Sequence, residues 1–261
     1  MTVYQRLNRR AWARLAHAGS ESSQPFDRAQ LRRSAEWLDP WEWIPWKQVR
    51  SVLCLASGGG QQAPSFAYLG YKTTLVDLSR VQMEVDRAVA RRHGLEIEFI
   101  EADMLDLSSL QGRCFDLVYQ PVSACYVPDV RRLYRQVARV LRPGGYYRVE
   151  HWNPYQMQLD PAAPWDGQGY RLVEPQGTRE PVPLTWLLRS PNGQKQVETL
   201  CHYIHPLHDM IGGLCDAGFK ILRYGERLRG RPDAAVGSYP HLRAHVPSFL
   251  AMFAQIANGQ P

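Results

Sequence analysis

The chain has 261 residues, 44% hydrophobic and 21% charged, so it can bury a sizeable core and is not disordered as a whole. Its net charge is +6, yet no basic run with interleaved aromatic residues marks a nucleic-acid surface, and no apolar run is long enough to span a bilayer. Five cysteines without Cys-x-x-Cys spacing argue against a disulfide framework and a zinc knuckle. We therefore expect a soluble, cytoplasmic protein without nucleic-acid or membrane partners.

The first segment, residues 1–48, is predicted to be a helical cover and connector that precedes a domain at 49–261. Its apolar residues at helical spacing are Tyr4, Leu7, Ala11, Trp12 and Leu15. This helix either packs on the edge of a sheet or forms a lid over a ligand, with Trp12 offering its ring face, and both interpretations stay open. The Trp- and Pro-rich stretch at 37–46 is interpreted as a packed connector rather than an aromatic binding platform.

The stretch from 51 to 77 has the pattern of a strand, a glycine turn, a helix and a second strand. It ends on Asp77, which lies 19 positions after Gly58, near the roughly 20 expected for an acid that binds a ribose. Glycines let a ligand touch the backbone, and N–H groups at a helix start can face it. A carboxylate at the strand tip can accept hydrogen bonds from both ribose hydroxyls. The pattern predicts a nucleoside site, with a structural turn as the alternative.

The remaining elements continue this alternation, with strands predicted at 97–100, 115–119, 146–149, 197–204 and 219–224. Asp103 follows the third strand, where it can accept a hydrogen bond from the exocyclic amine of an adenine, and Met104 can pack on the ring. The loop at 120–129 lies at the carboxyl end of a central strand, where sites in open α/β sheets gather. The Pro- and Trp-rich residues 153–196 are predicted to be a lid or a substrate-binding insertion.

Five segments in this order resemble the class I S-adenosylmethionine-dependent methyltransferases, of the methyltransferase domain 11 type that acts on small molecules. They are VLCLASGGGQQ (52–62), LVDLS (75–79), EADMLDL (101–107), FDLVYQPVSACYVPD (115–129) and LRPGGYYRVEHW (141–152). The resemblance covers about residues 49–152, and a helix–strand pair at 206–224 also fits. It implies an α/β, Rossmann-like sheet of seven strands, with helices on both faces and an antiparallel last strand.

The resemblance implies S-adenosylmethionine as the cofactor, S-adenosylhomocysteine as the product and a small molecule as the methyl acceptor. Carried over by position, the cofactor-binding residues are Ala56, Ser57, Gly58 and Gly60 for the methionine part, Asp77 for the ribose, Leu78, Asp103 and Met104 for the adenine, and Gln120, Pro121 and Val122 beside the sulfonium. One departure is that many members begin the glycine turn with an acid, whereas this chain has Ala56-Ser57-Gly58. The ammonium contact is then expected elsewhere, near Gln120 or from the N-terminal helix.

Methyl transfer from a sulfonium is an in-line displacement with an activated donor, so the protein needs mainly to align the nucleophile. Tyr126, in the loop after the fourth strand, is expected to orient the acceptor. His151, after the fifth strand, has an ordinary pKa near 6.5 and is expected to take a proton at neutral pH. A packed ring and a hydrogen-bonded loop histidine are their structural alternatives. The acceptor itself is not specified by the sequence, and the protein is expected to be a monomer or a homodimer.

Two other functions fit part of the pattern. Gly58-x-Gly60-x-x-Ala63 matches a dinucleotide-binding fingerprint and favours an NAD-dependent oxidoreductase. Against it are the second strand-end acid, Asp103, the LRPGG break at 141–145 and the lack of a Tyr-x-x-x-Lys pair. A non-catalytic nucleoside-binding protein with the same fold is the other alternative.

No metal site is expected. His202, His205 and His208 recur at three-residue intervals, but they straddle a predicted strand end and Pro206, so one shared face is not assured. Histidines in such a segment are more often polar loop residues than ligands.

Overall fold

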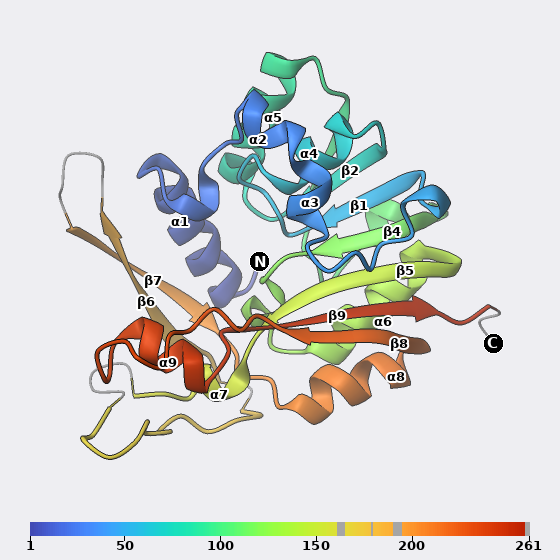
Figure 1. The fold of residues 1–261 in the computed structure, drawn as a ribbon. Coiled ribbons are helices and arrows are strands. Elements are labelled where there is room, and N and C mark those ends of the chain that lie inside the picture. The colour runs from blue at the N-terminus through green and yellow to red at the C-terminus, as the bar shows by residue number, and fades with distance from the viewer. Residues whose placement is uncertain (161–164, 179, 190–194, 259–261) are drawn as a thin grey trace.

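The computed structural model describes residues 1–160, 165–178, 180–189 and 195–258. A seven-stranded sheet forms its centre (Figure 1). In spatial order the strands are β3 (Ile97–Glu101), β2 (Lys72–Asp77), β1 (Ser51–Leu55), β4 (Phe115–Gln120), β5 (Leu141–Trp152), β9 (Phe249–Ile256) and β8 (Phe219–Glu226). The first five are parallel and β9 runs antiparallel to both its neighbours. The predicted fold class is confirmed, and the order reverses between β1 and β4, where such sheets open a crevice.

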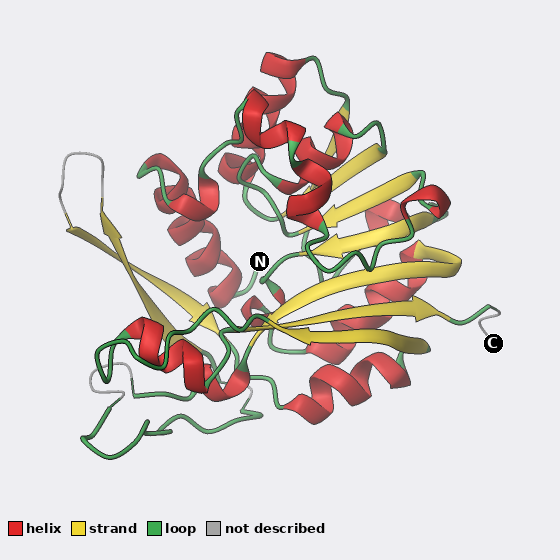
Figure 2. Cartoon of the chain, in the orientation of Figure 1, coloured by secondary structure: helices red, strands yellow, loops and turns green. Residues whose placement is uncertain are grey.

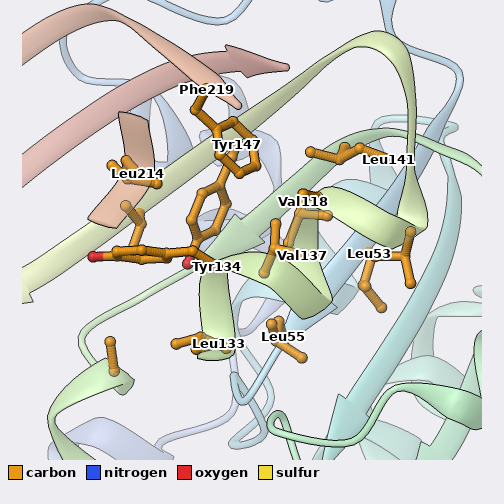
Figure 3. Close-up of a cluster of buried hydrophobic side chains, with 14 of the residues drawn as sticks. Leu53, Leu55, Val118, Leu133, Tyr134, Val137, Leu141, Tyr147, Leu214 and Phe219 are labelled. Carbon is orange, nitrogen blue, oxygen red and sulfur yellow. The ribbon is translucent and has the colours of Figure 1, made fainter. Parts of the chain in front are cut away.

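Helices cover both faces of the sheet (Figure 2). On one face lie α3 (Ser34–Leu38), α4 (Gln62–Tyr68) and α5 (Arg80–His93), and on the other α6 (Val130–Val140) and α8 (Gly213–Asp216). Each face of the sheet has its own hydrophobic core, the first beneath α3, α4 and α5 and the second beneath α6 and α8. Successive side chains of a strand point to opposite faces, so Cys54 lies in the first core, and Leu53 and Leu55 lie in the second. Figure 3 shows the second core, in which Tyr134 meets Tyr147 edge-on at 6.1 Å between ring centres.

The helix boundaries follow the capping residues. The Ser79 hydroxyl accepts a hydrogen bond from the N–H of Gln82 at 3.3 Å, and Gly94 ends α5 with a φ of +64°. The buried face of α5 differs from the apolar pattern, because Gln82 and Asp86 are buried while Ala88 is exposed. Both polar side chains have partners near the glycine turn, which the pattern of apolar residues does not reveal.

The N-terminal segment consists of α1 (Val3–His17), η1 (Glu21–Ser23), α2 (Arg28–Arg32), α3 and η2 (Trp46–Gln48). Helix α1 packs on α5 and also on β7 of the insertion. In the connector, Leu38 and Ile44 are buried and Trp41 stacks on Trp43, with ring centres 4.6 Å apart. Most of the Trp-rich stretch is therefore packed against the domain, whereas Trp37 at its start is 39% exposed.

The segment after β5 carries α7 (Pro154–Met157) and a separate hairpin of β6 (Val182–Arg189) and β7 (Lys195–His202). Part of the expected insertion, at 161–164, 179 and 190–194, lies outside the described residues. The expected helix after Pro206 begins as a π-helical turn, η5 (His208–Gly212), which buries Met210 but leaves Ile211 37% exposed. No clear sequence pattern predicts helix α9 (Tyr239–His245). The remaining helical elements are two short turns, η3 (Ser108–Leu110) and η4 (Ala124–Tyr126). None of the described helices combines the length and apolarity needed to cross a bilayer.

Candidate cofactor site

A cavity lies at the carboxyl ends of β1, β2 and β3, and residues of α1 form its opposite wall. The predicted site residues that line it are Ala56, Gly58, Asp77, Leu78, Asp103, Met104 and Tyr126. The glycine turn and the two strand-end acids, which are separated in the sequence, therefore meet at one cavity. The parallel strands bring them together because their carboxyl ends share one edge of the sheet.

Asp77 holds the start of the glycine turn. One carboxylate oxygen accepts a hydrogen bond from the N–H of Gly58 at 2.9 Å, and the other accepts from the N–H of Ser79 at 2.7 Å. Burial raises the pKa of Asp77. Each oxygen has a second lone pair, so the carboxylate can still accept from two ribose hydroxyls. A Cβ added at Gly58 would lie 2.7 Å from the Cβ of Gln82, so only glycine fits here.

A second acid, Asp86 of α5, lies beneath the same turn and had no role in the sequence analysis. Its side chain is fully buried, one oxygen accepts from the N–H of Gly59 at 2.7 Å, and the other has no hydrogen-bond partner in the described chain. Burial raises its pKa to about 8. The N–H groups of Gly58 and Gly59 thus face protein carboxylates, whereas the sequence analysis expected free N–H groups to face the ligand.

Asp86 should make the protein less stable as the pH rises. Its pKa is about 8 in the folded chain against 3.8 unfolded, so the folded state holds an extra proton between these values and loses stability through pH 8. His151 has the opposite effect on stability. Burial lowers its pKa from 6.5 to about 3, so the unfolded chain takes up this proton first as the pH falls, and the folded state loses stability. The two effects cancel between about pH 4 and 6.5, so these two groups should leave stability flat there and lower it above pH 6.5.

Urea unfolding over a pH series measures this effect in wild type and in Asp86→Asn. Between pH 6.5 and 8 wild type should lose about 2 kcal/mol, from roughly 1.4 kcal/mol per pH unit for one proton. The neutral amide should remove that loss, and below pH 6.5 it should reveal the loss from His151 that Asp86 offsets in wild type. An equal alkaline loss in the variant would show that Asp86 is not the group responsible.

Helix α1 makes specific contacts with the cavity. The Gln5 side-chain amide donates a hydrogen bond to one carboxylate oxygen of Asp103, while the other oxygen accepts from the N–H of Leu105 at 2.9 Å. Gln82 donates to the carbonyl of Trp12 at 2.9 Å, and the Trp12 ring meets Tyr126 edge-on at 5.8 Å. The helix therefore covers the cavity rather than only the edge of the sheet.

Five predicted cofactor residues do not line this cavity: Ser57, Gly60, Gln120, Pro121 and Val122. Gln120 is fully buried, donates to the Ser123 hydroxyl at 2.9 Å and accepts from the Tyr147 hydroxyl, so its side chain braces the sheet. At Gly60 an added Cβ would lie 2.9 Å from the Cα of Pro25, which shows that the connector covers this end of the turn. Contact of these five residues with the cofactor stays a prediction.

The two residues expected near the acceptor have different surroundings. Tyr126 lines the cavity, and burial raises its pKa well above the ordinary value of 10. His151 is 1% exposed, and its Nε2 is hydrogen-bonded to the Tyr134 hydroxyl at 2.9 Å. Because burial lowers the pKa of His151 to about 3, its imidazole stays neutral at pH 7. A ring with so low a pKa is a weak base at pH 7, which argues against the expected role of taking a proton there.

The histidines weighed as metal ligands point to separate partners. The His202 ring stacks on Trp152 at 6.3 Å, His205 Nε2 lies 3.2 Å from the carbonyl oxygen of Ala124, and the side chain of His208 is 76% exposed. Within the described ranges, no group of three or more His, Cys, Asp or Glu side chains is placed to hold a metal ion.

The strand order, the glycine turn and the acids at the ends of β2 and β3 together define a class I S-adenosylmethionine-dependent methyltransferase. The family's methyltransferase-domain profile matches residues 53–149. The chain is 30% identical over 236 residues to the uncharacterized methyltransferase YbaJ of Bacillus subtilis (strain 168), covering 85% of this chain and 90% of that relative. The chain belongs to this family, and its cofactor is S-adenosylmethionine.

Solved structures share the fold at low sequence identity. An S-adenosylmethionine-dependent methyltransferase from Clostridium acetobutylicum ATCC 824 superposes with a TM-score of 0.62 at 15% identity, covering 94% of this chain and 99% of that one. The CcbJ methyltransferase from Streptomyces caelestis gives 0.63 at 18% identity, covering 93% and 96%.

Proposed function

We propose that this enzyme transfers the methyl group of S-adenosylmethionine to a small-molecule acceptor by in-line displacement. The observation that carries the proposal is that both strand-end acids and Tyr126 line one cavity covered by α1, because a covered cavity with a few polar groups suits a small molecule. A nicotinamide dinucleotide and a non-catalytic role are set aside by the membership of the methyltransferase family.

In this proposal the strand-end acids hold the nucleoside. Asp77 accepts from the ribose hydroxyls, and Asp103 accepts from the exocyclic amine of the adenine. The Gln5 amide now donates to Asp103 with the same kind of N–H₂ group that an adenine would offer. We propose that the adenine amine takes the place of this amide on Asp103, so that Gln5 moves when the adenine binds.

At the methyl end we propose alignment without a general base. Tyr126 stays a neutral phenol at pH 7, since burial raises its pKa, and can orient an acceptor through its hydroxyl. His151 is neutral and bonded to Tyr134, so its role is to support the end of β5. Rate enhancement then comes from holding the acceptor in line with the sulfonium.

A transfer assay with isotope-labelled S-adenosylmethionine and a set of small hydroxyl, amine, thiol and carboxyl compounds tests the proposal. We expect label in at least one compound together with stoichiometric S-adenosylhomocysteine. Tyr126→Phe should lower turnover much more than cofactor affinity. Transfer only to a protein or nucleic acid added to the same assay would contradict the small-molecule assignment.

The cover should tighten when cofactor binds, because α1 is tied to the insertion. The Asn8 side chain donates to the Cys201 carbonyl at 2.8 Å and accepts from its N–H at 2.7 Å, and Arg14 donates to Glu198 at 2.7 Å. Hydrogen exchange should show α1 and β7 protected together by S-adenosylhomocysteine. Asn8→Ala should remove the protection of β7 while α1 stays protected, and Arg10→Ala, at an exposed position, should leave both protected. If S-adenosylhomocysteine protects neither segment in wild type, α1 and β7 are structural additions and not a cover.

A further inference from the structure

A second cavity is lined in part by the end of β4 and the loop that follows it. Its wall includes Tyr119 and Pro121 from β4 and its loop, and Arg227 and Arg229 beyond β8. The next turn of the same loop, with Tyr126, lines the cofactor cavity. Residues of one loop, at the carboxyl end of a central strand, therefore line both cavities, and none of the proposed nucleoside contacts lines the second one.

A charged cluster forms the floor of this cavity. Glu150, whose side chain is 8% exposed, pairs with Arg227 and lies 3.6 Å from the guanidinium of Arg148, which is 1% exposed. Two arginines thus share one carboxylate, which leaves a surplus of one positive charge at a site of low dielectric constant. Neither Nη1 nor Nη2 of Arg148 donates a hydrogen bond within the described chain.

Aromatic rings offset part of the cost of burying these cations. Arg148 lies over the Tyr119 ring at 5.2 Å and near Trp41 at 5.6 Å, and Arg227 lies near the same Trp41 at 5.5 Å. Rings do not neutralise a charge, and an uncompensated buried cation is costly. Arg229, which is exposed on the wall, adds a second positive charge to the cavity.

The other charged groups of the wall do not cancel this surplus. Arg33 and Glu36 also line the cavity, but they pair with each other at 3.0 Å and so add no net charge. The cavity combines an excess of positive charge with the apolar faces of Phe26 and Trp37. This combination suits a small organic anion better than a neutral or cationic molecule.

We propose that this cavity binds the methyl acceptor through an anionic group, a carboxylate or a phosphate, held by Arg227 and Arg229. The inference rests on the proposed function, because it names the class of the acceptor. Arg148 and Arg227 both lie near the Glu150 carboxylate, so this carboxylate neutralises only part of the Arg227 charge. The rest of that charge is available to a ligand. The acceptor's remaining part reaches past Pro121 toward the cofactor.

Calorimetry on the full chain saturated with S-adenosylhomocysteine tests the proposal with benzoate, phenyl phosphate and neutral benzamide. We expect the anions to bind at least about tenfold more tightly than benzamide, since a charge-assisted hydrogen bond is lost with the amide. Arg227→Gln and Arg229→Gln should each weaken the anions about tenfold. Arg223→Gln is the matched control, because Arg223 is exposed on β8 and donates to the carbonyl of Leu222.

The tighter of the two anions identifies the group, carboxylate or phosphate. Equal binding of benzamide and both anions would overturn the inference, as would an equal loss in Arg223→Gln. Arg229 is exposed and has no hydrogen bond or ion pair among the described residues, so its variant keeps the test valid if Arg227→Gln unfolds. Cofactor binding is measured in the same samples: if it is intact while the anions fail, only the acceptor class is wrong, and if it is absent the proposed function fails too.

Discussion

Replacing Asp77 with alanine should weaken the binding of S-adenosylmethionine by about 1.5–3 kcal/mol, the range for hydrogen bonds to a charged group. The substitution removes the acceptor proposed for the ribose hydroxyls. It also leaves the N–H groups of Gly58 and Ser79 without their acceptor, at 2.9 and 2.7 Å in the wild-type chain. Isothermal calorimetry with S-adenosylmethionine measures the change.

Asp166→Ala is the matched control for this experiment. Asp166 is exposed and also accepts from two backbone N–H groups, those of Gln168 at 2.9 Å and Gly169 at 2.8 Å, but it lies away from the cofactor cavity. Its variant should bind the cofactor like wild type. Unchanged affinity in Asp77→Ala would remove Asp77 from the site.

Gly58→Ala should both destabilise the fold and impair cofactor binding. The new methyl group would lie 2.7 Å from the Gln82 Cβ and 3.1 Å from the Asp77 carboxylate, so α5 and the turn must separate. Overpacking of this kind costs about 1–3 kcal/mol. Urea unfolding and calorimetry on the same samples measure the two effects.

Gly169→Ala controls for the loss of a glycine, because a Cβ added there meets nothing within 4 Å. It should leave both measurements near wild type. If Gly58→Ala kept wild-type stability and affinity, the close approach of α5 to the glycine turn would not exist in solution.

The sheet and the cofactor acids could be predicted from the sequence because their signals are local. Short apolar runs at 52–55 and 115–119 mark strands buried on both faces, and each lies within a strand of the structure. Asp77 directly follows an apolar run and Asp103 follows another by three positions, so their place at the strand ends follows from the pattern. In the structure both line the same cavity.

The polar residues that complete the site could not be predicted in this way. Gln82 and Asp86 are four positions apart on one face of α5, but a pattern of apolar residues assigns polar side chains to solvent. Their burial depends on partners elsewhere, the carbonyl of Trp12 and the N–H of Gly59. Asn8 likewise contacts Cys201, 193 positions away in the chain.

The burial of His151 is a further feature that the sequence could not predict. An ordinary histidine titrates near 6.5, and only the packing around β5 shows that this ring is buried against Tyr134 with its pKa near 3. The surplus positive charge beside Glu150 could not be predicted from the sequence either, because Arg148 comes from β5 and Arg227 from the segment after β8. Such clusters appear only when the strands are placed side by side.

A crystal structure of the full chain with S-adenosylhomocysteine tests the central claim most directly. The account predicts the ribose on Asp77, the adenine amine on Asp103 with the Gln5 side chain displaced, and the sulfur directed toward the loop after β4. A nucleoside bound outside the cavity beneath α1, or an adenine whose amine leaves Gln5 still bonded to Asp103, would contradict it.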